Sequence, residues 1–173
     1  MNLASHCRIC ENQLYDIEVG TRCSLTNDRP SFREKCSEIR LEKKYENIIK
    51  EVNIEYELVR RTKLISYANF VFFLLVSVLL ISAGYFFGKY GLEKGVISTV
   101  PLIIIGAGIL VLPLASGPLN KYRQSIAVAK KKKEELDKVL ALYNTKYTIE
   151  VIVNKDLHGN KEIDTKLTFL RKY

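Results

Sequence analysis

Two uncharged stretches decide the fold of this chain: LISYANFVFFLLVSVLLISAGYFFG, residues 64–88, and GVISTVPLIIIGAGILVLPLASGPLN, residues 95–120. Neither contains Asp, Glu, Lys, Arg or His. A bilayer core about 30 Å thick needs about 20 apolar residues in a helix, because each residue adds about 1.5 Å. A chain of 173 residues rarely buries two such helices in a soluble core. The sequence therefore predicts a two-pass membrane protein.

Charges beside these stretches predict the orientation. The loop at residues 89–95 is too short to form a domain, so both ends of the chain lie on one side of the membrane. Excess Lys and Arg mark the cytoplasmic side. The loop has only Lys89 and Lys94, whereas the outer flanks carry Lys50, Arg60, Arg61, Lys63, Lys121, Arg123 and Lys130 to Lys133. Both termini are therefore predicted to be cytoplasmic, and the polar residues 1–30 contain no cleavable signal peptide.

The formal net charge of +8 favours lipid over nucleic acid as a partner. A basic segment beside a membrane is attracted to anionic headgroups by about 1 kcal/mol per Lys or Arg. Nucleic-acid binding needs basic residues on a recognisable fold or between aromatic residues, and the sequence has neither pattern. The predicted partners are the lipid bilayer, further copies of the chain and a cytoplasmic protein.

Four cysteines predict a metal-binding segment at residues 1–36, called here the cysteine head. Cys7, Cys10, Cys23 and Cys36 follow the spacing C-x2-C-x12-C-x12-C. Four thiolates can close a tetrahedral structural zinc site that leaves no position for water, so the site would not be catalytic. Gly20 and the turn-forming residues 26–30 supply the bends. Bound zinc would also explain how so polar a segment folds.

Other interpretations of these residues stay open. The cysteines could be free and unrelated, Cys7 and Cys10 could form a redox pair, or all four could hold an iron–sulfur cluster. Disulfides are rare in the reducing cytoplasm. His6 and His158 are alternative ligands, but an ordinary surface position is the simpler interpretation of both.

Helical periodicity continues outside the membrane stretches and predicts two cytoplasmic arms, with Ser31 or Ser37 as a cap for the first. Apolar residues recur three or four positions apart. In the first arm these are Leu41, Tyr45, Ile48, Val52, Tyr56 and Val59. In the second they are Leu119, Tyr122, Ile126, Ala129, Leu136, Leu140 and Tyr143, with Lys133 at one core-type position. The arms are predicted to pair as an antiparallel coiled coil, or to pair between subunits.

The tail, residues 145–173, alternates apolar and polar residues and predicts a β-hairpin with its turn at residues 154–162. We expect this hairpin to pack on the cysteine head or to pair with other subunits. The predicted fold is mainly α, a transmembrane hairpin extended by a coiled coil. Its parts are a zinc-finger-like head (1–36), an arm (37–66), a membrane helix (67–88), an external loop (89–95), a membrane helix (96–118), an arm (119–144) and the β-hairpin (145–173).

Small residues within the membrane helices predict close helix packing. Gly84, Gly88, Gly106 and Gly108 would let two backbones approach each other. They could pack the hairpin on itself or build an oligomer, and the sequence does not favour either. Pro101 and Pro113 are candidates for kinks in the second helix.

The sequence carries no signature of an enzyme or an ion-coupled transporter. It has no glycine-rich phosphate loop, nucleophile elbow or His-Glu metalloprotease motif. Only two histidines are present, and the membrane stretches have no ionisable residue. A non-enzymatic role is therefore expected, and an enzyme with a redox or metal-dependent head is the least favoured class.

Two resemblances suggest what that role is. The run Cys7-x-x-Cys10, Gly20-x-x-Cys23-x-Leu25-Thr26 and Pro30-x-Phe32-x-x-x-Cys36 resembles a cysteine module of small bacterial proteins, especially of the Bacteroides group. The two-span layout resembles the small membrane effectors of bacterial antiphage systems. It implies an inner-membrane protein that oligomerises and perturbs the membrane when a cytoplasmic partner signals. The alternative is a structural anchor or scaffold for a cytoplasmic complex.

Overall fold

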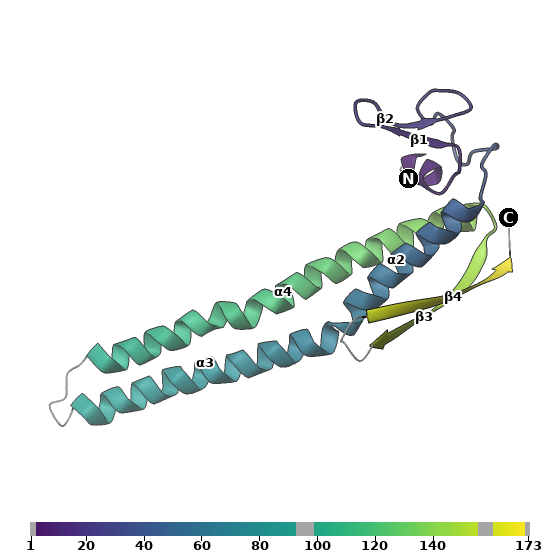
Figure 1. Cartoon of the computed structure of the whole chain (residues 1–173). Coiled ribbons are helices and arrows are strands. Elements are labelled where there is room, and N and C mark those ends of the chain that lie inside the picture. Colours follow the sequence, from purple (N-terminus) through teal and green to yellow (C-terminus); the bar gives the residue numbers. More distant parts are fainter. Residues whose placement is uncertain (1–2, 93–98, 156–160, 172–173) are drawn as a thin grey trace. The chain divides into compact units, whose positions relative to one another are not determined.

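The structure is a computed structural model that describes residues 3–92, 99–155 and 161–171 (Figure 1). The chain forms two compact units. Unit 1 comprises Met1–Leu58 and Val128–Tyr173, and unit 2 comprises Val59–Ala127.

Unit 2 consists of α3, Lys63–Leu92, and the first part of α4, which spans Thr99–Leu142. Both helices are long and apolar enough to cross a membrane, as predicted. Their large apolar side chains point outward, with Leu64 82% exposed and Leu110 76% exposed. In each helix only 11% of the most apolar 18-residue window is buried. Most of the apolar surface of these two helices is therefore exposed in the described structure.

Small residues set the spacing between α3 and α4. A Cβ atom on Gly84 would lie 2.7 Å from Ile105 Cγ1, and one on Gly108 would lie 2.8 Å from Ile81 Cγ1. The fully buried Ser77 hydroxyl donates a hydrogen bond of 2.7 Å to the Gly108 carbonyl. These contacts use the predicted glycines to pack the hairpin on itself.

The other two predicted glycines, Gly88 and Gly106, differ in how close their neighbours lie. A Cβ atom on Gly88 would lie 3.2 Å from Pro101 Cβ, which is a close contact within the same hairpin. A Cβ atom on Gly106 would meet no atom within 4 Å. Gly106 is thus the one of the four that faces open space. The helix itself is not interrupted at the prolines, because α4 continues through Pro113 and Pro118.

Unit 1 packs its helices and strands around one hydrophobic core. It contains α1 (Leu3–Arg8), β1 (Gln13–Asp16), β2 (Gly20–Cys23), most of α2 (Lys43–Arg61), the end of α4, β3 (Lys146–Lys155) and β4 (Lys161–Arg171). The buried core residues are Ile9, Cys10, Ile39, Tyr45, Ile49, Val52, Leu136, Val139, Leu140 and Tyr143. Both predicted arms contribute, but Ile49 is fully buried in α2 whereas Ile48 only packs against the core from its edge.

The helix α2 begins at Lys43, later than the predicted start near Ser31 or Ser37. The residues just before it are used for contacts with the cysteine head, since the Glu11 N–H donates to the Arg40 carbonyl at 3.0 Å. The Glu11 carboxylate in turn accepts a hydrogen bond of 2.7 Å from the Lys44 N–H. A carboxylate at a helix N-terminus satisfies a free N–H and complements the helix dipole. The cap comes from a distant residue, which helical periodicity cannot reveal.

The end of α4 directs the chain into β3. Asn144 adopts a left-handed conformation with φ of 53°. The Thr145 N–H bonds the Leu140 carbonyl at 3.0 Å, and the Asn144 N–H bonds the Ala141 carbonyl at 3.1 Å. This pair of bonds is a Schellman motif, which satisfies the last carbonyls of a helix.

The predicted C-terminal β-hairpin is confirmed. The strands β3 and β4 pair antiparallel, with Ile149 opposite Leu167 and Tyr147 opposite Phe169. These four side chains pack against the core of unit 1, and the Phe169 ring lies 5.5 Å from that of Tyr45 in α2. The hairpin therefore packs on α2, which the sequence did not predict, and its expected packing on the cysteine head stays a prediction. Most of its predicted turn, including His158, lies outside the described residues.

Replacing Gly84 by Leu should disrupt the hairpin of unit 2, because the new side chain would collide with Ile105. We expect a loss of about 1–3 kcal/mol, as for overpacked cores, measured as a lower temperature of thermal unfolding in detergent. Gly106→Leu is the matched control, since it adds the same bulk where no atom lies within 4 Å. Equal effects of the two substitutions would contradict this packing.

Candidate metal centre

Cys7 lies in the last turn of α1, and Cys10 ends the tight turn that follows this helix. The Cys10 N–H donates a hydrogen bond of 3.0 Å to the Cys7 carbonyl. Both cysteines are buried, and Ile9 between them enters the core of unit 1. The apolar packing of Ile9 in the core therefore holds this turn in place.

The third cysteine is brought back by a short hairpin. Cys23, the last residue of β2, lies opposite Gln13 in β1. Gly20 has a φ of 87°, which an L side chain rarely adopts. The Asp16 carboxylate accepts hydrogen bonds from the N–H groups of Glu18 and Val19, at 2.8 and 3.3 Å. These two bonds lower the pKa of Asp16. The predicted bend at Gly20 thus does return the chain toward Cys10.

A second turn follows Cys23 and confirms another expected bend. The Cys23 N–H donates to the Asp28 carbonyl at 3.0 Å, and the Asn27 N–H donates to the Cys23 carbonyl at 2.8 Å. Asn27 itself is left-handed, with φ of 56°. The chain then leaves this turn toward Cys36.

The fourth cysteine is anchored to the end of α4. The Cys36 N–H donates a hydrogen bond of 3.0 Å to the Tyr143 hydroxyl. The same hydroxyl is hydrogen bonded to His6 Nδ1 at 2.9 Å. Burial raises the pKa of Tyr143, so the phenol stays neutral.

The four cysteines meet at one small cavity. Its volume is about 20 Å³, and its lining comprises His6, Cys7, Cys10, Asn12, Gln13, Cys23, Cys36, Glu38 and Ile39. All four thiols are free. The structure therefore brings together every cysteine that the sequence selected, although three separate segments supply them.

These thiols are close neighbours but are not arranged as a finished metal site. Among residues 3–92, 99–155 and 161–171, no group of three or more His, Cys, Asp or Glu side chains is positioned to hold a metal ion. Burial, followed by the neighbouring Cys10, Cys23 and Cys36, raises the pKa of Cys7 to about 11. Cys7 is consequently a neutral thiol in this arrangement at neutral pH.

The expectation of a surface position is wrong for His6. Its side chain is buried, and its ring makes edge contacts with Phe32 and Tyr143, at 5.2 and 5.7 Å between ring centres. Burial lowers the pKa of His6, so its imidazole stays neutral. Because Nδ1 is engaged with Tyr143, His6 acts as a packing and hydrogen-bonding residue beside the cavity.

Two hydrogen-bond donors at the cavity were not found from the sequence. The Arg40 N–H points to Cys10 Sγ at 3.4 Å. Asn12 Nδ2 is buried and has no hydrogen-bond partner within the part of the chain that the structure describes. The only sequence feature that could have linked Asn12 to the cavity was its closeness to Cys10 in the sequence. Arg40 lies 30 residues from Cys10, the cysteine that its N–H contacts, and gave no such signal.

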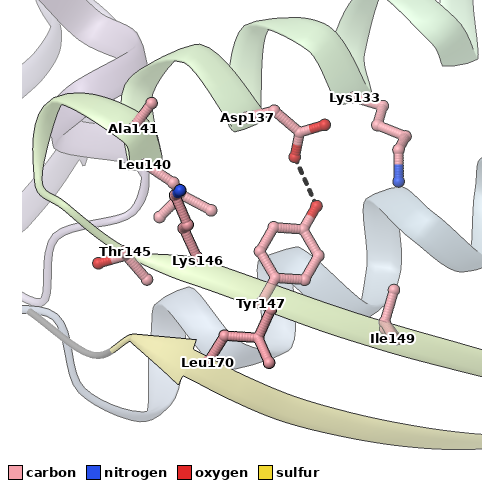
Figure 2. A pocket seen from close by; sticks show the side chains of 9 residues that line it. All are labelled: Lys133, Asp137, Leu140, Ala141, Thr145, Lys146, Tyr147, Ile149 and Leu170. Atoms are coloured by element: carbon pink, nitrogen blue, oxygen red, sulfur yellow. Dashed lines mark hydrogen bonds between the residues drawn. The ribbon is translucent and has the colours of Figure 1, made fainter.

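A second cavity, of about 410 Å³, lies in unit 1 between α4 and the β-hairpin (Figure 2). At its polar side the Tyr147 hydroxyl donates a hydrogen bond of 2.6 Å to the Asp137 carboxylate. The Asn53 amide donates to the Tyr147 oxygen at 3.1 Å, and Lys133 Nζ donates to Asn53 Oδ1. Burial, then the bond to Asp137, raises the pKa of Tyr147.

This network explains the lysine that interrupts the apolar periodicity of the second arm. The Lys133 ammonium also lies 5.7 Å from the centre of the Tyr56 ring, a cation–π contact. The polar groups of the cavity are thus bonded to one another, and they specify how α2, α4 and β3 fit together. We assign this cavity a structural role.

The comparisons with known proteins identify no relative. No family model matches the chain, and the searches of curated proteins and of solved structures found no match. The function must therefore be argued from the side chains and their contacts.

Replacing Tyr147 by Phe should destabilise unit 1, because the half-buried carboxylate of Asp137 and the amide of Asn53 both lose a hydrogen bond. Asn53 keeps its bond to the Ile49 carbonyl, so the loss is that of ordinary hydrogen bonds, about 0.5–1.5 kcal/mol. Chemical denaturation in detergent should show a lower midpoint. Tyr15→Phe is the matched control, because Tyr15 is 75% exposed. An unchanged midpoint for Tyr147→Phe would refute the assigned role.

Proposed function

We propose that this chain is a non-enzymatic two-pass protein of a bacterial inner membrane, and that unit 1 is a cytoplasmic adaptor module that binds a protein partner. The observation that carries the proposal is the pair α3 and α4, which expose apolar side chains along their length while packing closely on each other. Lipid is the solvent in which such outward-facing side chains are stable, and helices satisfy their own backbone groups there.

Aromatic residues support the placement of the span. Tyr67 in α3 and Tyr122 in α4 form an edge contact with ring centres 6.3 Å apart, close to Lys63 and Lys121 in sequence. Tyrosines are enriched at the membrane–water interface. Tyr85 is 61% exposed near the other end of α3, about 27 Å along the helix from Tyr67 at 1.5 Å per residue. That separation fits a hydrocarbon core about 30 Å thick.

The orientation follows from charge. The residues before α3 and after the apolar part of α4 are rich in Lys and Arg, whereas the loop between the helices has two lysines. The positive-inside rule then puts both termini, and with them unit 1, in the cytoplasm. The short loop is on the outer side.

Within unit 1, we propose that α2 and the end of α4 pair as an antiparallel coiled coil. Both helices contribute buried apolar residues to the same core. Lys132 Nζ lies 2.8 Å from Glu55 Oε1, an ion pair that joins the two helices. Such flanking pairs set the orientation of paired helices. The result is a rigid stalk on which the cysteine head and the β-hairpin are presented to a partner.

The adaptor role is favoured over a pore because glycines of the spans pack within one hairpin. Two helices cannot enclose a water path, so a pore needs several copies. Gly84 and Gly108 are occupied by packing within one hairpin. The groups that line the two cavities described above are thiols and a mutually bonded polar network, which suit structural roles.

An oligomerising effector that perturbs the membrane, as in antiphage defence, is the second candidate. The observation in its favour is the open surface of α4 at Gly106 and Gly117, where an added Cβ would meet no atom within 4 Å. A helix from another copy could approach closely there.

Reporter fusions test the orientation. We expect a fluorescent protein to fold and fluoresce at either terminus, and alkaline phosphatase to be active only when inserted at Gly91. The phosphatase needs export for activity, so the two reporters give opposite signals. Phosphatase activity at the C-terminus would rule out the proposed topology.

Overproduction separates the adaptor from the effector. With a potential-sensitive dye, cells that overproduce an adaptor should keep their membrane potential, because one helix hairpin opens no water path. Depolarisation by the unaltered chain would contradict the adaptor. If Gly106→Leu then abolished the depolarisation while Gly106→Ala kept it, assembly through the open face of α4 would be supported.

A further inference from the structure

We propose that Cys7, Cys10, Cys23 and Cys36 bind one zinc ion as four thiolates, in a closed structural site that fastens the cysteine head to the end of α4. The proposal does not depend on the adaptor role, because it concerns the folding of unit 1 alone. It begins from the convergence of all four cysteines on one cavity.

The size of the cavity is compatible with a single ion. A volume of about 20 Å³ accommodates roughly one water-sized sphere. An iron–sulfur cluster carries several metal ions with bridging sulfides and needs more room than this. Among mononuclear metals, four thiolates in a tetrahedron favour zinc.

Hydrogen-bond donors point to charged sulfur. The Arg40 N–H is directed at Cys10 Sγ, at 3.4 Å. Asn12 lines the same cavity, and its Nδ2 atom is buried and has no partner in the described structure. A thiolate is a far better acceptor than a thiol, and metal-bound ligands are regularly held by such outer contacts. Zinc binding would supply the acceptor that Asn12 lacks.

A nearby lysine can offset part of the negative charge of a four-thiolate zinc site. Four thiols lose their protons to solvent when they bind one Zn²⁺, so the complex carries a charge of −2. The Lys44 ammonium lies 3.1 Å from the Cys10 carbonyl oxygen and 2.8 Å from Gln13 Oε1, beside the cavity. It offsets part of this charge without contacting the metal.

Closing the site requires the sulfurs to move, since they are not positioned to hold a metal in the present arrangement. Three of the cysteines border turns: Cys7 and Cys10 begin and end one, and Cys23 begins another. The fourth, Cys36, is held through its backbone by Tyr143. Its side chain can therefore turn toward zinc while the link to α4 is kept.

The test is metal analysis of the full chain, purified in detergent with a thiol reductant and no chelator. We expect about one zinc and no iron per chain. Cys10→Ser and Cys23→Ser should each lower the zinc content at least fivefold. Tyr15→Phe is the control, because Tyr15 lies in the cysteine head but is 75% exposed and does not line the cavity, and it should keep its zinc.

Cobalt substitution keeps the test informative where a cysteine variant fails to fold. The unaltered chain, stripped of zinc and loaded with Co²⁺, should show the absorption bands of tetrahedral thiolate coordination, and added zinc should abolish them. Zinc below about one-fifth per chain with four titratable thiols would overturn the proposal. A disulfide among the four cysteines, or iron with acid-labile sulfide, would overturn it equally.

Discussion

The Tyr143 hydroxyl joins parts of unit 1 that are far apart in the sequence. It accepts a hydrogen bond from the Cys36 N–H and is bonded to His6, while the Tyr143 ring lies in the core. The cysteine head has few apolar residues of its own, so it cannot fold by hydrophobic burial alone. Ile9 and Ile39 enter the core beside Tyr143, and Glu11 caps α2. Each of these contacts depends on the helices already being in place.

Buried polar groups find their hydrogen-bond partners in different ways in the two units. In unit 2, Ser77 donates to the Gly108 carbonyl, and Gly84 and Gly108 allow close contact with Ile105 and Ile81 of the facing helix. In unit 1, Lys133 and Asp137 are both tied into a network through Asn53 and Tyr147. A network in which each group has a partner specifies one arrangement of the elements, because any other would leave polar groups unpaired.

Local patterns in the sequence predicted the helices and strands. Contacts between residues far apart in the sequence explain the features that these patterns did not predict. Alternation predicted β3 and β4, and uncharged length predicted α3 and α4, because each pattern lies within a single element. The start of α2 was misplaced because Glu11 and Arg40 determine it from outside the helix. His6 was assigned to the surface because its partner Tyr143 lies 137 residues away. The spacing of the cysteines identified the four residues, but not the donors Asn12 and Arg40.

The bond between Cys36 and Tyr143 has a consequence for the order of synthesis, since 107 residues separate them. A ribosome that adds about 5–20 residues per second needs about 5 to 20 seconds to cover this distance. Both apolar helices emerge in that interval. The head can therefore form this bond only after both helices have been synthesised. A truncated chain that ends before residue 143 would lack the hydroxyl, and Cys36 would have no link to the end of α4.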